Sequence, residues 1–161
     1  MIRPAQTDDI PEVRAMLREY VAWIGLDLAF QQIDDEIAEL PGDYDEPTGA
    51  LLVAEENHHL IGMIALRPLP DGAWLAEARS AKVAEMKRLW VRPEGRGRGV
   101  AKELVAQILD QARHLNYDEI RLDTLPMMTN AQSLYESLGF HDVAAYYKTP
   151  IKGTRFMAKR L

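Results

Sequence analysis

Residues 91–109, VRPEGRGRGVAKELVAQIL, place three glycines at alternate positions directly before a run of helical character. Three glycines in five residues suit a backbone that must adopt positive φ angles or approach another molecule closely. The apolar residues that follow recur every three or four positions, which predicts a helix docked on a core. The first N–H groups of such a helix lack partners, and together with the helix dipole they bind anions. The segment therefore predicts an anion-binding turn between a strand and a helix.

Two common phosphate-binding motifs do not fit these glycines. A P-loop requires Lys and then Ser or Thr after its last glycine, whereas Val100 and Ala101 follow Gly99. The dinucleotide fingerprint G-x-G-x-x-G fails because neither pair of alternate glycines leads to a third glycine at the required spacing. These mismatches disfavour a nucleoside triphosphate and NAD. The simpler alternative is a glycine-rich turn on a solvated basic surface.

The composition narrows the class of protein. A chain of 161 residues with 47% hydrophobic content suits one core, so we expect one domain over residues 1–161. The net charge of −6 argues against a nucleic-acid partner. Because the chain has no cysteine, disulfides, thiolate metal sites and a cysteine nucleophile are excluded, and we expect no metal. Since no apolar run approaches a membrane span of about 20 residues, we expect a cytoplasmic protein without a membrane partner.

Strand and helix patterns alternate along the rest of the chain. The expected strands are 2–5, 49–56, 59–69, 82–91, 119–125 and two more within 140–161. The expected helices are 7–25, 33–40, 100–115 and 130–138. Thr7 or Asp8 would cap the first helix, and Thr129 with Gln132 would form a capping box for the last one. This order predicts an α/β fold with a mixed, mostly antiparallel twisted sheet of about six to seven strands flanked by about four helices.

The RGRGVA segment, residues 96–101, resembles the R/Q-x-x-G-x-G/A signature of the GNAT superfamily of acyl-CoA-dependent N-acetyltransferases. EMKRLWVRPEGRGRG is similar to the central strand and pyrophosphate loop of that family, and AQSLYESLGF to its later A-x-x-L-Y-x-x-x-G-F helix. IRPAQTDDIPEVRAML resembles its first strand and helix, so the similarity covers nearly the whole chain. The resemblance implies acetyl transfer from the cosubstrate acetyl-CoA directly to a primary amine of a small-molecule or peptide acceptor.

The resemblance also implies which residues hold acetyl-CoA. A bulge in the central strand would free an amide for the oxyanion. Relatives often carry asparagine where this chain has Met128, and we predict that Asn130, two positions later, contacts the cofactor instead. The arm and thioester would pair with main-chain groups of Leu89, Trp90 and Val91. The pyrophosphate would bind the amides of Arg96, Gly97, Arg98, Gly99, Val100 and Ala101.

Two side chains are candidates for proton transfer. The acceptor amine must lose a proton before it attacks, and Glu85 lies where some GNAT members carry a catalytic glutamate. Strand alternation places Glu85, Lys87 and Leu89 on one face. The alternative for Glu85 is an ion pair with Lys87 or a neighbouring strand. Tyr135 matches the tyrosine that donates a proton to the departing CoA thiolate, and its alternative is packing in the core.

A second function remains open at this point. The rival is a non-catalytic acyl-CoA-binding sensor or regulatory module, against which Glu85 and Tyr135 favour an enzyme. The acidic run at 34–46 contains no basic residue, and a solvated acidic face is the expected explanation, with a cationic substrate as the alternative. The oligomeric state is also open, with a homodimer among the alternatives.

Overall fold

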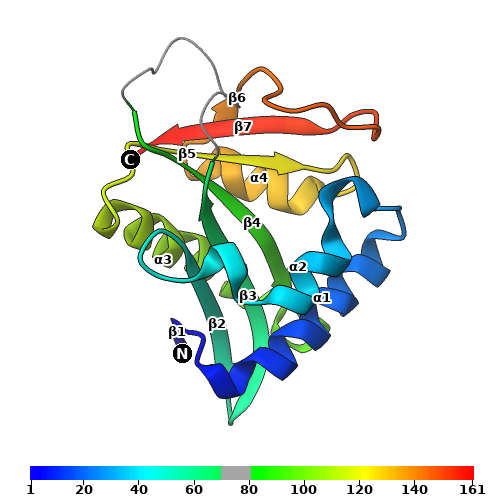
Figure 1. The fold of residues 1–161 in the computed structure, drawn as a ribbon, viewed down its shortest axis with the longest axis vertical. Helices are drawn as coiled ribbons and strands as arrows, with labels where there is room; N and C mark the ends of the chain where they lie inside the picture. Colours follow the sequence, from blue (N-terminus) through cyan, green and yellow to red (C-terminus); the bar gives the residue numbers. More distant parts are fainter. Residues whose placement is uncertain (70–80) are drawn as a thin grey trace.

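The computed structural model describes residues 1–69 and 81–161. One sheet of seven strands has the order β1-β2-β3-β4-β5-β7-β6, and four α-helices of the described residues pack on it (Figure 1). The strands are β1 (Ile2–Pro4), β2 (Ala50–Glu56), β3 (His59–Pro68), β4 (Val83–Val91), β5 (Glu119–Thr124), β6 (His141–Asp142) and β7 (Arg155–Arg160). The helices are α1 (Ile10–Ile24), α2 (Ile33–Glu39), α3 (Val100–His114) and α4 (Thr129–Ser137). The predicted architecture is confirmed.

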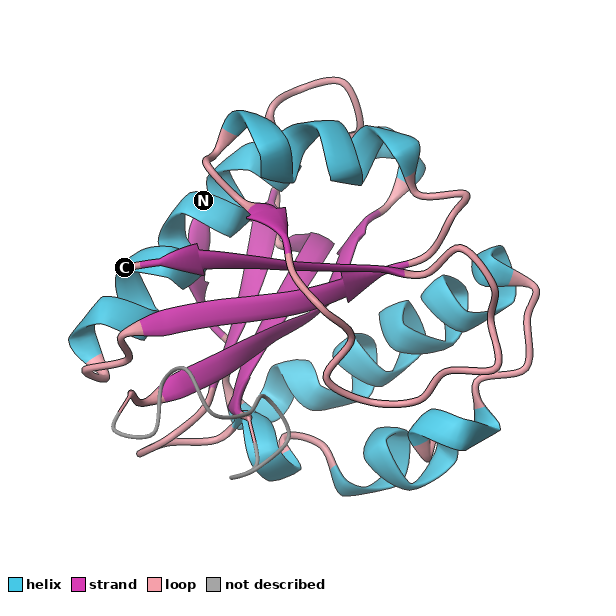
Figure 2. Cartoon of the chain, turned by 90° about the horizontal axis from the view of Figure 1, so that it is seen from above, coloured by secondary structure: helices cyan, strands magenta, loops and turns pink. Residues whose placement is uncertain are grey.

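Helices cover both faces of the sheet, as the view from above shows (Figure 2). Helices α1 and α2 bury Val13, Met16, Leu17 and Ile37 against one face, together with Met63 and Ala65 of β3. Helices α3 and α4 bury Leu104, Ile108 and Tyr135 against the other face, together with Ile64 and Met86. None of the helices in the two described ranges is long and apolar enough to cross a membrane.

Strands β4 and β5 form the parallel pair of an otherwise antiparallel sheet. They pair over three positions only: Val83 with Glu119, Ala84 with Ile120, and Glu85 with Arg121. Beyond these positions β4 continues to Val91 and β5 to Thr124, and the two strands diverge (Figure 1). The sheet is therefore split along its middle toward the carboxyl ends of these strands.

A β-bulge interrupts β4 beside the split. The register shifts between Met63 and Ala65 of β3, so that Ile64 lies opposite both Arg88 and Leu89. Arg88 has a φ of 62°, a left-handed conformation that is uncommon for a residue with a side chain. A bulge leaves one residue of the longer strand without a partner in the ladder. The bulge predicted for this strand is thus present.

The bulge changes which side chains share a face. Lys87 lies opposite Ala65 of the α1/α2 core, and Arg88 binds Glu36 of α2, so both side chains lie on that face. Leu89 packs against the α3/α4 core instead. The prediction that Leu89 shares a face with Lys87 is therefore wrong, because the extra residue reverses the alternation at this point.

The helix caps also differ from the expected ones. Helix α1 follows a 3₁₀ turn over Thr7–Asp9, and Asp9, rather than Thr7 or Asp8, precedes its first residue. Helix α4 is preceded by Met128, which has no side-chain capping bond, and the Gln132 amide donates to the Leu125 carbonyl oxygen at 2.9 Å. The predicted capping box is therefore wrong, since the Gln132 side chain satisfies the preceding loop.

Candidate active site

A cavity of about 380 Å³ occupies the gap between β4 and β5. Its lining includes residues packed in the α3/α4 core, such as Met86 and Leu122, and residues of the α1/α2 core, such as Tyr20 and Trp90. The cavity therefore passes between the two strands from one face of the sheet to the other. The predicted site residues that line it are Leu89, Trp90, Val91, Arg96, Gly97, Gly99, Val100, Ala101, Asn130 and Tyr135.

The glycine segment forms an open cradle at the α3 end of this cavity. Gly97 and Gly99 have φ angles of 71° and 81°, and a Cβ built on either would meet no atom within 4 Å. Gly99 precedes the first residue of α3 and, without a side chain, leaves the helix amides uncapped. These residues fit a phosphate group, since uncapped amides at the positive end of a helix face open space.

Basic side chains of the segment are already engaged. Arg92 bonds two glutamates of α1, and Arg98 forms an ion pair with Glu56 at the surface. The Arg96 Nε donates to the Val91 carbonyl oxygen at 2.9 Å. Arg98 does not line the cavity, unlike its neighbours Gly97 and Gly99. An anion in the cradle would therefore meet the main chain first, and Arg96, which lines the cavity, has no carboxylate partner among the described residues.

The bulge in β4 is held from the α2 side. The buried Arg88 guanidinium donates to both oxygens of Glu36, at 2.8 and 3.0 Å, and to Gln31 at 2.9 Å. Burial alone would raise the pKa of Glu36, but the hydrogen bonds and charge of Arg88 outweigh burial and hold that pKa below its ordinary value. Glu36 is thus no part of a solvated acidic face, contrary to the expectation for the 34–46 run.

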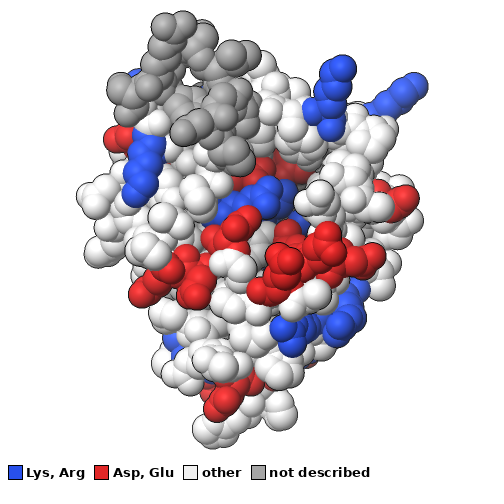
Figure 3. Space-filling view, in the orientation of Figure 1, with Lys and Arg blue, Asp and Glu red and all other residues white. Residues whose placement is uncertain are grey.

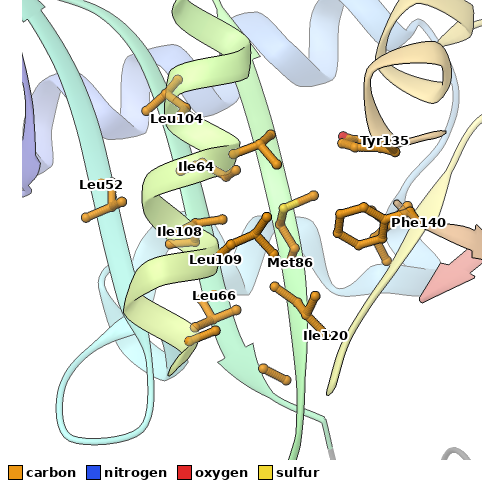
Figure 4. Close-up of a cluster of buried hydrophobic side chains, with 14 of the residues drawn as sticks. Leu52, Ile64, Leu66, Met86, Leu104, Ile108, Leu109, Ile120, Tyr135 and Phe140 are labelled. Atoms are coloured by element: carbon orange, nitrogen blue, oxygen red, sulfur yellow. The ribbon is translucent and has the colours of Figure 1, made fainter. Parts of the chain in front are cut away.

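Tyr135 of α4 belongs to the core and lines the cavity. Its ring lies 5.7 Å from that of Phe140, and Figure 4 shows the two side by side across from Met86. Burial, followed by the nearby Tyr20 and Asp123, raises the pKa of Tyr135 above its ordinary value. The group is therefore a neutral phenol at physiological pH, which can donate a proton.

Glu85 lies behind the cavity and does not line it. Its side chain is buried, and its two oxygens accept hydrogen bonds from Arg67 at 2.9 Å and from the Tyr146 hydroxyl at 2.6 Å. Lys87 Nζ is 3.8 Å from the same carboxylate. The structure therefore places Glu85 in the ion pair that was the alternative to a catalytic role.

Asp123 of β5 is a carboxylate that lines the cavity and that the sequence patterns did not single out. Its Oδ2 accepts from the Tyr147 hydroxyl at 2.6 Å, and its Oδ1 is 3.7 Å from Lys87 Nζ. Burial would raise the pKa of Asp123, but the Lys87 charge and the Tyr147 hydrogen bond outweigh burial and lower it. The sequence could have indicated Asp123, because it lies near the carboxyl end of β5, and ligands of α/β sheets bind at the carboxyl ends of parallel strands.

Comparison with known proteins agrees with this geometry. Residues 13–140 match the model of the Acetyltransferase (GNAT) family. An uncharacterized N-acetyltransferase of Schizosaccharomyces pombe is 35% identical over 150 residues, which cover 92% of this chain and 86% of that protein. The fold matches a GNAT acetyltransferase of Staphylococcus aureus with a TM-score of 0.77 at 19% identity, covering 99% of this chain and 98% of that one.

A second solved structure contains the cofactor of this family. It is a putative acetyltransferase from Salmonella typhimurium with acetyl-CoA, and it superposes with a TM-score of 0.69 at 19% identity over 99% of this chain and 92% of that chain. The family match spans more than half of the chain and includes the cradle, the bulge and Tyr135. This chain therefore belongs to the GNAT family and is an acetyl-CoA-dependent N-acetyltransferase.

Proposed function

We propose that the chain transfers acetyl from acetyl-CoA directly to a primary amine in a ternary complex, with Asp123 as the base and Tyr135 as the acid. The observation that carries this assignment is the cavity itself. One continuous lining joins the anion cradle, the bulge in β4, a carboxylate and a neutral phenol. The chain has no cysteine, so no enzyme thiol can carry the acetyl group as a covalent intermediate. This favours direct attack by the amine.

Each proton in this reaction has a place. The acceptor ammonium gives a proton to Asp123, and the free amine nitrogen attacks the thioester carbon. The main-chain N–H groups at Arg88 and Leu89, at the bulge, would bind the developing oxyanion, where a preorganised donor contributes about 3 kcal/mol of transition-state stabilisation. The C–S bond of the tetrahedral intermediate then breaks, and the Tyr135 hydroxyl protonates the CoA thiolate. The nitrogen gives its second proton back to the Tyr135 phenolate as the amide forms, and Asp123 releases its proton to solvent.

Glu85 stays the second candidate for the base. It reaches the cavity only past Lys87, whereas Asp123 lines the cavity directly. Release of the CoA thiol from acetyl-CoA in the presence of a panel of amines tests the proposal as a whole. Tight binding of acetyl-CoA without thiol release from any amine would instead favour the non-catalytic sensor or regulatory module.

Replacing Gly99 with alanine should weaken acetyl-CoA binding at least tenfold, which corresponds to about 1.4 kcal/mol. The added methyl would occupy the open space that we assign to a phosphate group. Calorimetric titration with acetyl-CoA measures the affinity directly.

Gly25 supplies a matched control for this substitution. It ends α1 with a φ of 66°, a Cβ there would also meet no atom within 4 Å, and it does not line the cavity. Gly25→Ala and Gly99→Ala therefore carry a similar backbone strain of about 1 kcal/mol or more. If both variants bind acetyl-CoA as tightly as the native protein, the cradle is only a structural turn.

Replacing Glu36 with glutamine should lower the melting temperature at pH 7 by about 4–8 °C, from a loss of about 2 kcal/mol in the charged hydrogen bonds to Arg88. Because the pKa of Glu36 is lowered in the folded state, its stabilisation is present above the unfolded pKa and is lost as pH falls through the folded value. The difference in melting temperature between Glu36→Gln and the native protein should therefore become smaller below about pH 4.

Asp35→Asn is the control for Glu36→Gln. It removes the same charge from the first turn of α2 at an exposed position. Thermal unfolding of both variants between pH 3 and 7 separates the buried pair from the general effect of charge. A loss in Glu36→Gln that is the same at every pH would contradict the assigned role of the ion pair.

A further inference from the structure

The acceptor must approach from the α1/α2 face. The cradle and Tyr135 lie with the α3/α4 core, whereas Trp23, Leu28 and Lys87 line the cavity on the opposite side of the sheet. Figure 3 shows this opposite face, where basic side chains lie in a recess between acidic ones. The groups inside this recess therefore select the acceptor, and their chemistry indicates its class.

Lys87 is the notable group on this side. Its side chain is only 5% exposed, yet it lines the cavity. Its Nζ lies 3.7 Å from Asp123 Oδ1 and 3.8 Å from Glu85 Oε1, and both distances exceed hydrogen-bond length. Among the described residues, the Lys87 ammonium thus faces two carboxylates without a hydrogen bond to either.

Both carboxylates already have stronger partners. The Tyr147 hydroxyl donates to Asp123 and the Tyr146 hydroxyl to Glu85, each at 2.6 Å. Arg67 adds a further bond to Glu85. These short hydrogen bonds hold the carboxylates in place, while the three donors of the ammonium point at no acceptor of the described residues. Lys87 Nζ is not among the buried atoms that lack a partner in the described residues, so the ammonium is open to the cavity, where its donors can bind an oxygen that enters.

Apolar side chains form part of the cavity rim. Trp23 of α1 and Met127, just before α4, are 49% and 41% exposed, and both line the cavity. The buried Leu28 and Leu125 continue this lining inward. A buried charge pair beside these apolar side chains fits a ligand with adjacent charges at one end and an apolar group at the other.

We propose that the acceptor is a free α-amino acid with an apolar side chain, whose carboxylate binds Lys87 and whose ammonium faces Asp123. This inference rests on the proposed function and narrows the amine to one class. The α-carboxylate would supply the acceptor that Lys87 lacks within 1–69 and 81–161, and it would hold the amine beside the base. A diamine would place its second cation against Lys87 and Arg88, and a peptide N-terminus carries a neutral amide where the carboxylate is needed.

Three acceptors of similar size test the proposal on the native protein: L-phenylalanine, L-phenylalaninamide and 2-phenylethylamine. We expect kcat/KM for phenylalanine, measured by CoA thiol release and product mass, to exceed both other values at least tenfold. The amide has the less basic amine, so intrinsic reactivity favours it and works against the expected result. In addition, 3-phenylpropanoate should compete with phenylalanine, and its neutral amide should not.

Lys87→Met removes the ammonium at similar volume, and the ratio of kcat/KM for phenylalanine to that for its amide should fall to within threefold of one. Lys87→Arg keeps the charge and should keep the preference. Lys148→Met, at an exposed position, should leave the ratio unchanged. The native panel and the competition experiment decide the matter even if Lys87→Met does not fold.

The outcomes separate this inference from the proposed function. Equal rates for phenylalanine and its amide, or a preference for the amine that lacks a carboxylate, would overturn the inference and leave the N-acetyltransferase mechanism standing. If no amine of any class supports thiol release, the proposed function and this inference are both overturned.

Discussion

Asp123→Asn should lower kcat/KM by about a thousandfold at neutral pH, within the range of 10²–10⁴ for the loss of a general base. Asparagine keeps the shape and the polar contacts of Asp123 but cannot accept a proton from the ammonium. The loss should shrink as pH rises, because more of the acceptor then arrives as free amine. Steady-state rates of thiol release between pH 6 and 10 measure both effects.

Glu85→Gln is the comparison that gives this experiment its meaning. It also removes a carboxylate beside Lys87, but one that lies behind the cavity lining. Because the pKa of Asp123 is lowered, Asp123 is ionised throughout the measured range, and the acid limb of the native profile should follow the amine alone. If Glu85→Gln instead shows the larger, pH-sensitive loss of kcat/KM and Asp123→Asn stays near the native value, then Glu85 is the base.

Tyr135→Phe should lower kcat by about a hundredfold while the affinity for acetyl-CoA and the melting temperature stay nearly native. The phenylalanine ring keeps the contact with Phe140 and loses only the hydroxyl that we assign to protonation of the thiolate. We expect the lower end of the range for an acid catalyst, because a thiol with a pKa of about 8.5 is already a good leaving group.

The measurement must be made where chemistry limits the rate, since slow product release would mask part of the effect. Single-turnover mixing of an acetyl-CoA complex with the acceptor meets that condition. Because burial raises the pKa of Tyr135, the hydroxyl keeps its proton at alkaline pH. Ionisation of Tyr135 should therefore cause no decline in the native rate as the pH rises to about 9. If the single-turnover rate of Tyr135→Phe is within twofold of the native rate, Tyr135 is a core residue without a role in proton transfer.

Much of the fold could be predicted because the local patterns agree with the tertiary structure. The alternating glycines before 100–115 marked the boundary between β4 and α3, and Gly99 does adopt the positive φ that its position indicated. The two residues between the predicted strands 49–56 and 59–69, Asn57 and His58, form the turn that joins β2 and β3, and both have positive φ. These features depend on neighbouring residues, which a sequence pattern records directly.

The site was less predictable because its key features depend on contacts between distant segments. At the bulge, β4 has one residue more than β3, and this extra residue reverses the face of the Leu89 side chain. The alternation within β4 alone does not reveal it. Asp123 becomes a cavity residue only because β5 leaves β4 after Arg121. Glu36 lies 52 positions before Arg88, and in the sequence it is one acidic residue among several.

The short β4–β5 pairing has a consequence for the lifetime of the protein. Three residue pairs join the half of the sheet made of β1 to β4 to the half made of β5 to β7, so the unliganded seam is a weak point for local opening. Acetyl-CoA bound in the gap would bridge both halves, and a concentration of 100 times Kd adds about 2.7 kcal/mol to the stability of the folded state. Amide hydrogen exchange along 86–91 and 122–124 should then slow, and resistance to proteolysis should rise and fall with the supply of the cosubstrate.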